Sequence, residues 1–96
     1  MLEKVRKALR ITTTSFDDEL ERLIETAIED LRVNTGAEIS VKRTNGKVAK
    51  VNPLIEIAII TYCRCNFGSP DDYDRLKKSY DEQKAQIRCN SDFGMR

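Results

Sequence analysis

The stretch from Asn52 to Gly68, NPLIEIAIITYCRCNFG, constrains the fold more than any other part of the chain. It begins with a helix-capping Asn followed by Pro53 at the first helical position, and it ends at a glycine that tolerates a left-handed stop. Apolar residues fall on nearly every side of the predicted helix: Leu54, Ile55, Ile57, Ala58, Ile59, Ile60, Tyr62, Cys63, Cys65 and Phe67. A helix that is apolar all round must be surrounded. We therefore expect other helices of the chain, or other copies of it, to cover this one.

The size and composition indicate one small globular domain over residues 1–96. Apolar residues make up 40% of the chain and charged residues 34%, which is typical of a folded rather than a disordered protein. The 17 basic residues nearly balance the 16 acidic ones, which argues against a dedicated nucleic-acid binder but leaves a local basic patch open. No apolar run approaches the roughly 20 residues that span a bilayer, so we expect no membrane contact. The first ten residues lack the apolar stretch of a secretion signal.

Two helices are predicted before the apolar one. Apolar residues at spacings of three and four predict a short helix over Leu2 to Arg10. Ser15 is expected to cap the second helix, with Asp18 three residues on, and the helix should end near Asn34, before Gly36. Seven acidic residues and one base lie between its first and last apolar positions, so we expect a strongly negative outer face: Asp17, Asp18, Glu19, Glu21, Arg22, Glu25, Glu29 and Asp30.

The last helix is predicted to start near residues 69–72, SPDD. Its apolar residues form a narrow stripe like a coiled-coil seam: Tyr73, Leu76, Tyr80 and Ile87. Residues from about 89 to 96 lack a pattern and are expected to form a flexible tail. The predicted fold class is all-α, a small bundle of about four helices with a β-hairpin or extended loop between the second and third helices.

The hairpin is predicted over residues 38–51, because Asn45-Gly46 is a strong turn signal. A two-residue turn would pair Arg43 with Val48 and Val41 with Lys50, which scrambles the apolar face. A three-residue loop, residues 44–46, would instead place four apolar side chains on one face: Ile39, Val41, Ala49 and Val51. We expect the second register, because register follows the apolar pattern.

The expected core consists of the periodic apolar residues of the long helices: Phe16, Leu20, Leu23, Ile24, Ile28, Leu31, Leu54, Ile57, Ala58, Ile60, Leu76, Tyr80 and Ile87. On this assignment, Ile57→Asp should unfold the domain by burying an unpaired charge.

No catalytic, cofactor-binding or metal site is predicted, and no cofactor is expected. The chain has no histidine, which removes the commonest general base and a common metal ligand. Adjacent carboxylates at the helix starts are expected to be dipole partners and solvated charge. Cys63 and Cys65 lack a second ligand pair for zinc and point in different directions on a helix. We expect them to be reduced, small apolar residues.

One cluster of charge stands out on the hairpin: Lys42, Arg43, Lys47 and Lys50, with no acid between Ile39 and Ile55. One interpretation is a basic finger that meets phosphates or an acidic protein surface. The other is an edge strand that its lysines protect from pairing with other sheets. No aromatic residue interleaves the cluster, which weakens the case for single-strand binding.

Taken in order, these segments resemble a known family. A short basic helix (LEKVRKALRI) and a threonine-rich break precede an acidic amphipathic helix (FDDELERLIETAIEDL) and a variable insertion. The apolar helix and a final helix opened by SPDDYDRLKKSYDEQKAQI follow. From about Leu2 to Phe93 this resembles the small head–tail connector (adaptor) proteins of tailed bacteriophages and prophages.

The resemblance implies a structural, non-enzymatic protein of the virion, present in the cytoplasm of the bacterial host before assembly. It implies a homo-oligomeric ring under the portal protein, which extends the DNA channel and offers a docking platform to the next connector or tail protein. Double-stranded DNA would pass without sequence-specific contacts. The resemblance alone points to the C-terminal tail, with Phe93 and Met95, as a portal contact. The hairpin residues Lys42, Arg43, Lys47 and Lys50 are the expected partner or channel surface.

The rival interpretation is a small helical DNA-binding module with the hairpin as a basic wing. No predicted helix presents Arg, Lys, Asn and Gln clustered on one face, which argues against it.

Overall fold

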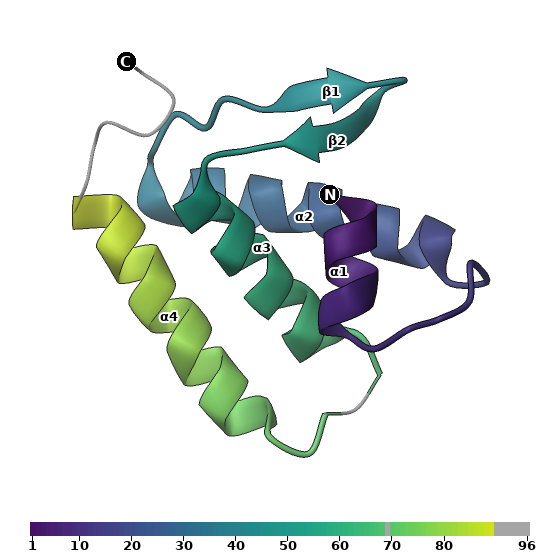
Figure 1. Cartoon of the computed structure of the whole chain (residues 1–96). Helices are drawn as coiled ribbons and strands as arrows, with labels where there is room; N and C mark the ends of the chain where they lie inside the picture. Colours follow the sequence, from purple (N-terminus) through teal and green to yellow (C-terminus); the bar gives the residue numbers. More distant parts are fainter. Residues whose placement is uncertain (69, 90–96) are drawn as a thin grey trace.

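The computed structural model describes residues 1–68 and 70–89, and within them it contains four helices and one two-stranded hairpin (Figure 1). The elements are α1 (Leu2–Ala8), α2 (Asp17–Thr35), β1 (Lys42–Thr44), β2 (Lys47–Lys50), α3 (Pro53–Asn66) and α4 (Tyr73–Cys89). This confirms a mostly helical bundle with a hairpin between the second and third helices.

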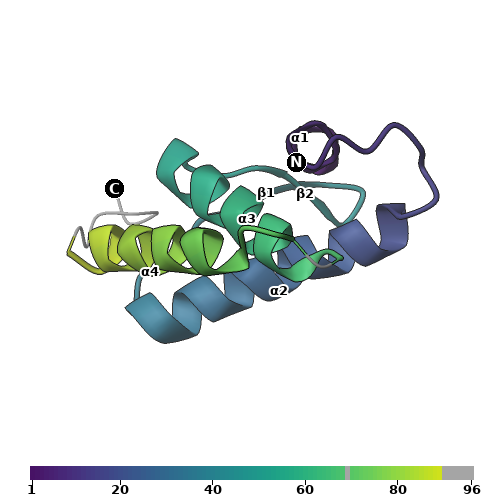
Figure 2. The ribbon, with the colours of Figure 1, turned by 90° about the horizontal axis from the view of Figure 1, so that it is seen from below.

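Helix α3 is the centre of the bundle. Figure 1 shows α1 and α4 on either side of it and α2 behind it, with the hairpin across one end. Seen from below, α2 forms a layer of its own beneath α3 and α1 (Figure 2). The molecule is flat, with principal extents of 37 × 34 × 18 Å, so α3 is covered from behind and from its sides by single elements.

The core lies where α2, α3, α4 and the hairpin meet. Its fully buried side chains come from every helix, and the largest are Val5, Leu20, Ile24, Ile28, Leu31, Ile55, Ile59, Cys63 and Ile87. Two residues of the expected core are exposed instead: Ile57 is 50% exposed and Phe16 is 43% exposed. Leu23, Leu54 and Ile60 are only partly buried against the core. The expectation for Ile57 is wrong because the elements that the structure describes leave this side of α3 uncovered, so that half of Ile57 reaches solvent.

The predicted start of α2 is also wrong in detail. The N-cap is Phe16, which gives no side-chain cap, whereas the Ser15 backbone N–H donates to Thr13 Oγ1 at 3.2 Å. The Phe16 ring instead packs edge-on against Phe67 at the far end of α3, with centroids 5.3 Å apart. The end of α2 is as predicted, because Gly36 adopts a left-handed φ of 69° there.

The start of α3 is as predicted. The Asn52 side chain accepts a hydrogen bond from the Leu54 N–H at 2.9 Å, and Pro53 occupies the first turn. Helix α4 begins at Tyr73, and it still includes Cys89, where the tail was expected to start. Ser69 and residues 90–96, with Phe93 and Met95, lie outside the described residues.

The hairpin register differs from the preferred one. The turn has two residues, Asn45 (φ 55°) and Gly46 (φ 78°), and the strands pair Arg43 with Val48. Two positive φ angles define a type I′ turn, whose twist matches that of the strands. The register then shifts between Arg43 and Lys42, so that Lys42 pairs with Lys50.

This shift makes Ala49 the extra residue of a β-bulge. The bulge removes the conflict that argued against the two-residue turn. Val48 and Val51, three residues apart, are only 4% and 5% exposed and both pack on the core. In a regular strand they would face opposite sides.

Candidate functional site

The two faces of the hairpin carry different chemistry. Arg43 and its partner Val48 lie on the face that packs toward the helices, and Val48 joins the core. Side chains alternate along a strand, so Lys42 and Thr44 lie on the other face, together with the residues opposite them, Lys50 and Lys47. All of the outer four are exposed. The bulge therefore gathers three of the four predicted basic residues on one outer face and separates Arg43 from them.

Arg43 is held by α2. Its Nη1 and Nη2 donate to Glu25 Oε2 at 2.5 Å and Oε1 at 3.0 Å, and Nη1 also donates to the Gly46 carbonyl at 3.3 Å. The hydrogen bonds from Arg43 lower the pKa of Glu25, and those to Glu25 raise the pKa of Arg43. A guanidinium that pairs with a carboxylate through two hydrogen bonds fixes the relative orientation of the two side chains. In the described structure Arg43 thus positions the hairpin, and a role for it at a partner surface stays a prediction.

In the part of the chain that the structure describes, the lysines of the outer face are not held by an ion pair as Arg43 is. Among the described residues, no salt bridge involves Lys42, Lys47 or Lys50. Lys42 and Lys50 are directly opposite each other across the strands, an arrangement of like charges that disfavours pairing. We call Lys42, Thr44, Lys47 and Lys50 the lysine face.

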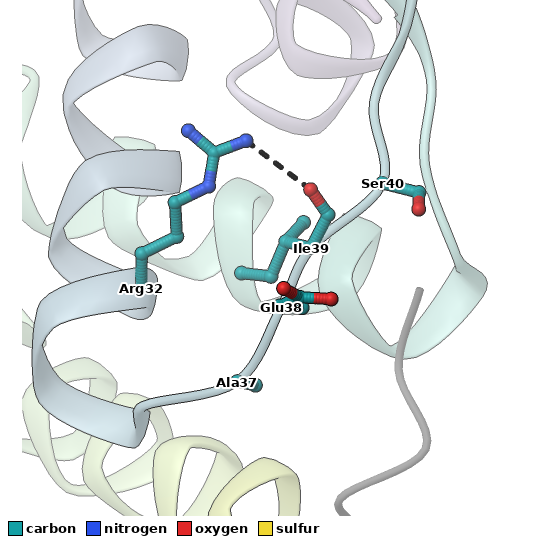
Figure 3. A pocket seen from close by; sticks show the side chains of 5 residues that line it. All are labelled: Arg32, Ala37, Glu38, Ile39 and Ser40. Carbon is teal, nitrogen blue, oxygen red and sulfur yellow. Dashed lines mark hydrogen bonds between the residues drawn. The ribbon is translucent and has the colours of Figure 1, made fainter. Parts of the chain in front are cut away.

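A second arginine fixes the segment that leads into the hairpin. A shallow depression of about 320 Å³ lies between the end of α2 and this segment. Figure 3 shows the five residues that line it: Arg32, Ala37, Glu38, Ile39 and Ser40. Arg32 Nη2 donates to the Ile39 carbonyl at 3.1 Å across it. This contact orders the backbone before β1, so two arginines hold the hairpin from its two ends.

A part-buried polar contact joins α4 to α2. The Tyr80 hydroxyl donates to Asp30 Oδ2 at 2.5 Å, the Tyr80 and Tyr62 ring centroids lie 5.5 Å apart, and Lys84 Nζ lies 4.8 Å from the Tyr80 centroid. Burial, followed by the hydrogen bond to Asp30, raises the pKa of Tyr80. A phenol that stays protonated in this way is a structural donor. Sequence reasoning missed this pair, which links residues 50 positions apart.

The cysteines and the carboxylate pairs show no arrangement for catalysis. Burial raises the pKa of the Cys63 thiol to about 12, so little reactive thiolate forms. Asp17 lies against Arg6, with Oδ1 and Nε 3.1 Å apart, and Asp72, just before α4, pairs with Arg75 in the first turn of that helix. Within residues 1–68 and 70–89, no group of three or more Cys, Asp or Glu is placed to hold a metal ion.

The exposed side of α3 is the second surface of interest. Pro53, Ile57, Ile60 and Arg64 recur at spacings of four, three and four, and so form one stripe along the helix. Pro53, Ile57 and Arg64 are exposed and Ile60 is half-buried. Figure 1 shows this helix open to the front between α1 and α4. We call these four residues the α3 stripe. Its i, i+4, i+7 spacing was readable in the sequence but was hidden by apolar residues on the other sides.

No helix among the described residues is long and apolar enough to cross a membrane.

Comparison with known proteins identifies the family. The chain matches the family model described as phage connector protein over residues 1–93, nearly its full length. No curated protein and no solved structure matches. The match covers all four helices and the hairpin between them. The chain therefore belongs to the phage connector proteins, a family of structural virion components.

Proposed function

We propose that this protein is a head–tail connector subunit that assembles as a ring under the portal, extends the DNA channel and presents a docking platform to the next connector or tail protein. Its work is binding, without catalysis. The proposal combines the family membership with one observation, the uncovered α3 stripe.

The stripe supports contact with another protein surface. Half of the Ile57 side chain reaches solvent from the helix that has the highest apolar content of the chain, and Pro53 beside it is exposed. A second copy that covers this stripe would complete the burial that the sequence pattern demands. A contact between two different faces of identical copies repeats around an axis, and it forms a ring when the rotation closes.

On the resemblance alone, we propose the segment after α4, with Phe93 and Met95, as a portal contact. On its cluster of basic residues, we propose that the hairpin, with Lys42, Arg43, Lys47 and Lys50, faces a partner or the channel. Before assembly the subunit is proposed to reside in the cytoplasm of the bacterial host.

The test uses the purified full chain, alone and with a portal protein, and native mass spectrometry to count subunits. Ile57→Asp places a charge in the middle of the stripe. Val33→Asp is the matched control, because Val33 is an aliphatic residue on α2 that is 79% exposed. Wild type and the Val33 variant should form a closed oligomer on the portal, and the Ile57 variant should stay single.

Two results would contradict the proposal. A wild-type chain that never oligomerises with any portal argues against a ring. An Ile57 variant that assembles as wild type does shows that the α3 stripe is not the contact between copies.

A further inference from the structure

We infer that the lysine face is a sequence-independent binding surface for the phosphate backbone of duplex DNA. The inference rests on the proposed function, since the face meets the genome only where the hairpin borders the channel. It assigns the contact to Lys42, Lys47 and Lys50 with Thr44, and it excludes Arg43.

A β-bulge at Ala49 decides the side of the hairpin on which Lys50 lies. With Ala49 paired regularly, Lys50 would turn toward the helices and Val51 away from them, because successive side chains alternate. The extra residue reverses this and brings Lys50 to the same side as Lys42 and Lys47. Bulges often re-aim side chains in this way.

The charges of the lysine face are placed unfavourably for strand pairing. Lys42 and Lys50 are cross-strand neighbours with no acid on the lysine face to neutralise them. Glu3 and Glu21 line the shallow groove of about 400 Å³ on the α1 side of β2, which Lys47 also borders. Lys42 and Lys50 are not among the residues that line this groove, so we place the main phosphate contact at these two lysines. Like charges that lie opposite each other weaken the pairing of the two strands. Such an arrangement without a compensating contact is typical of functional surfaces.

The residue types of the lysine face favour phosphate over an acidic protein as the binding partner. Protein interfaces are depleted in Lys and centre on aromatic or Arg anchors, and the lysine face has neither. Lys and Thr side chains are common ligands of phosphate oxygens. Arg43 carries the guanidinium group of the hairpin, which could form two parallel hydrogen bonds to a carboxylate or a guanine. This group is already bound to Glu25.

The lysine face is expected to bind DNA with low affinity. Three flexible lysines supply a weak contact that depends on counterion release, with no base-reading group among them. For three phosphates the slope of log K against log salt is about −2.7, so affinity should fall about 40-fold between about 50 and 200 mM salt. Such a surface can guide DNA and still let it slide.

The experiment measures fluorescence anisotropy of short labelled duplexes of two unrelated sequences with the purified full chain. The test variant is Lys42→Gln, Lys47→Gln, Lys50→Gln. The matched control is Lys7→Gln, Arg22→Gln, Lys78→Gln, which removes the same charge from exposed positions on three helices. Wild type and control should bind both duplexes equally, with the steep salt dependence above, and the test variant should lose at least about tenfold in affinity. Circular dichroism melting checks that both variants fold.

Equal binding by the test and control variants overturns the inference, as does a wild-type chain that does not bind duplex at low salt. A test variant that keeps its DNA affinity but loses portal binding also overturns it and assigns the face to an acidic protein. Native mass spectrometry of the same variants separates this result from the proposed function. A ring that forms normally with the test variant leaves the connector role intact while the DNA contact is decided by the anisotropy.

Discussion

Arg43 and Glu25 join the hairpin to α2 through two parallel hydrogen bonds, Nη1 to Oε2 at 2.5 Å and Nη2 to Oε1 at 3.0 Å. A two-stranded hairpin is marginal by itself. This one is held by the pair, by the Arg32 contact to the Ile39 carbonyl, and by Val48 in the core. The ion pair therefore decides the orientation of the lysine face more than it decides the stability of the bundle.

We expect Arg43→Gln to loosen the hairpin while the helices stay folded. Amide hydrogen exchange of residues 42–50 should accelerate several-fold, and exchange in α3 should not change. Lys42→Gln, on the other face, is the control and should leave these rates as they are. Unchanged protection in the Arg43 variant would mean that Val48 packing alone fixes the hairpin.

The same pair predicts a pH dependence. The hydrogen bonds from Arg43 lower the pKa of Glu25 from its ordinary 4.5, so the folded state binds this proton less readily than the unfolded chain does. The contribution of Glu25 is therefore complete above about pH 4.5 and disappears as the pH falls through the lowered pKa. The protection factors of the hairpin amides, which correct the exchange rates for their intrinsic dependence on pH, should fall in that window in wild type. In the Glu25→Gln variant, the protection factors of the same amides should not change across that pH window.

The Tyr80–Asp30 contact predicts a measurable loss of stability. Tyr80→Phe removes a donor that is 5% exposed and leaves Asp30 Oδ2 without it. We expect the free energy of unfolding to fall by about 1–3 kcal/mol, as for a hydrogen bond to a charged acceptor. Urea denaturation measures this. Tyr73→Phe, at a ring that is 43% exposed, should change the midpoint little. Equal midpoints for Tyr80→Phe and wild type would show that the contact is energetically neutral.

Aspartate substitutions at Ile59 and Ile57 distinguish the buried side of α3 from its exposed side. Ile59→Asp buries an unpaired charge at a fully buried position and should abolish cooperative folding. Ile57→Asp, at a half-exposed position, should change the free energy of unfolding of the isolated chain by only about 0.5 kcal/mol. Thermal melting by circular dichroism decides this. If the Ile57 variant were unfolded, the original expectation from the sequence would be correct and the stripe would be covered in solution.

The turn at residues 45–46 predicts a loss of hairpin stability that comes from backbone conformation and not from side-chain packing. Gly46 has a φ of 78°, and a Cβ placed there would meet no atom within 4 Å. Gly46→Ala should therefore destabilise the hairpin by about 1–2 kcal/mol through left-handed strain alone. Asn45→Gly, at a φ of 55°, should be tolerated. Relative amide exchange rates at Thr44 and Lys47 would measure both effects, and a fully protected Gly46→Ala hairpin would argue against the type I′ turn.

Local patterns were sufficient for the elements themselves. The period of Leu20, Ile24, Ile28 and Leu31 predicted α2, and the capping Asn52 with Pro53 predicted the start of α3, because capping and amphipathic period act within a few residues. The turn at Asn45-Gly46 was also readable, since both residues tolerate positive φ. The four basic hairpin residues were found from the sequence, although their partners were not.

Tertiary packing decided what the chain leaves open. Which side of α3 stays exposed at Ile57 depends on where α1, α2, α4 and the hairpin lie, and no period within a helix that is apolar all round encodes this. The hairpin register was decided by a bulge that lets Val48 and Val51 both reach the core, an energy gained only once the helices are in place. The separation of Arg43 from the three lysines follows from that register and from Glu25, 18 residues away on α2. The sequence by itself determined the helices, the turn and the charges, because those depend on neighbours along the chain. The surfaces offered to partners depend on neighbours in space.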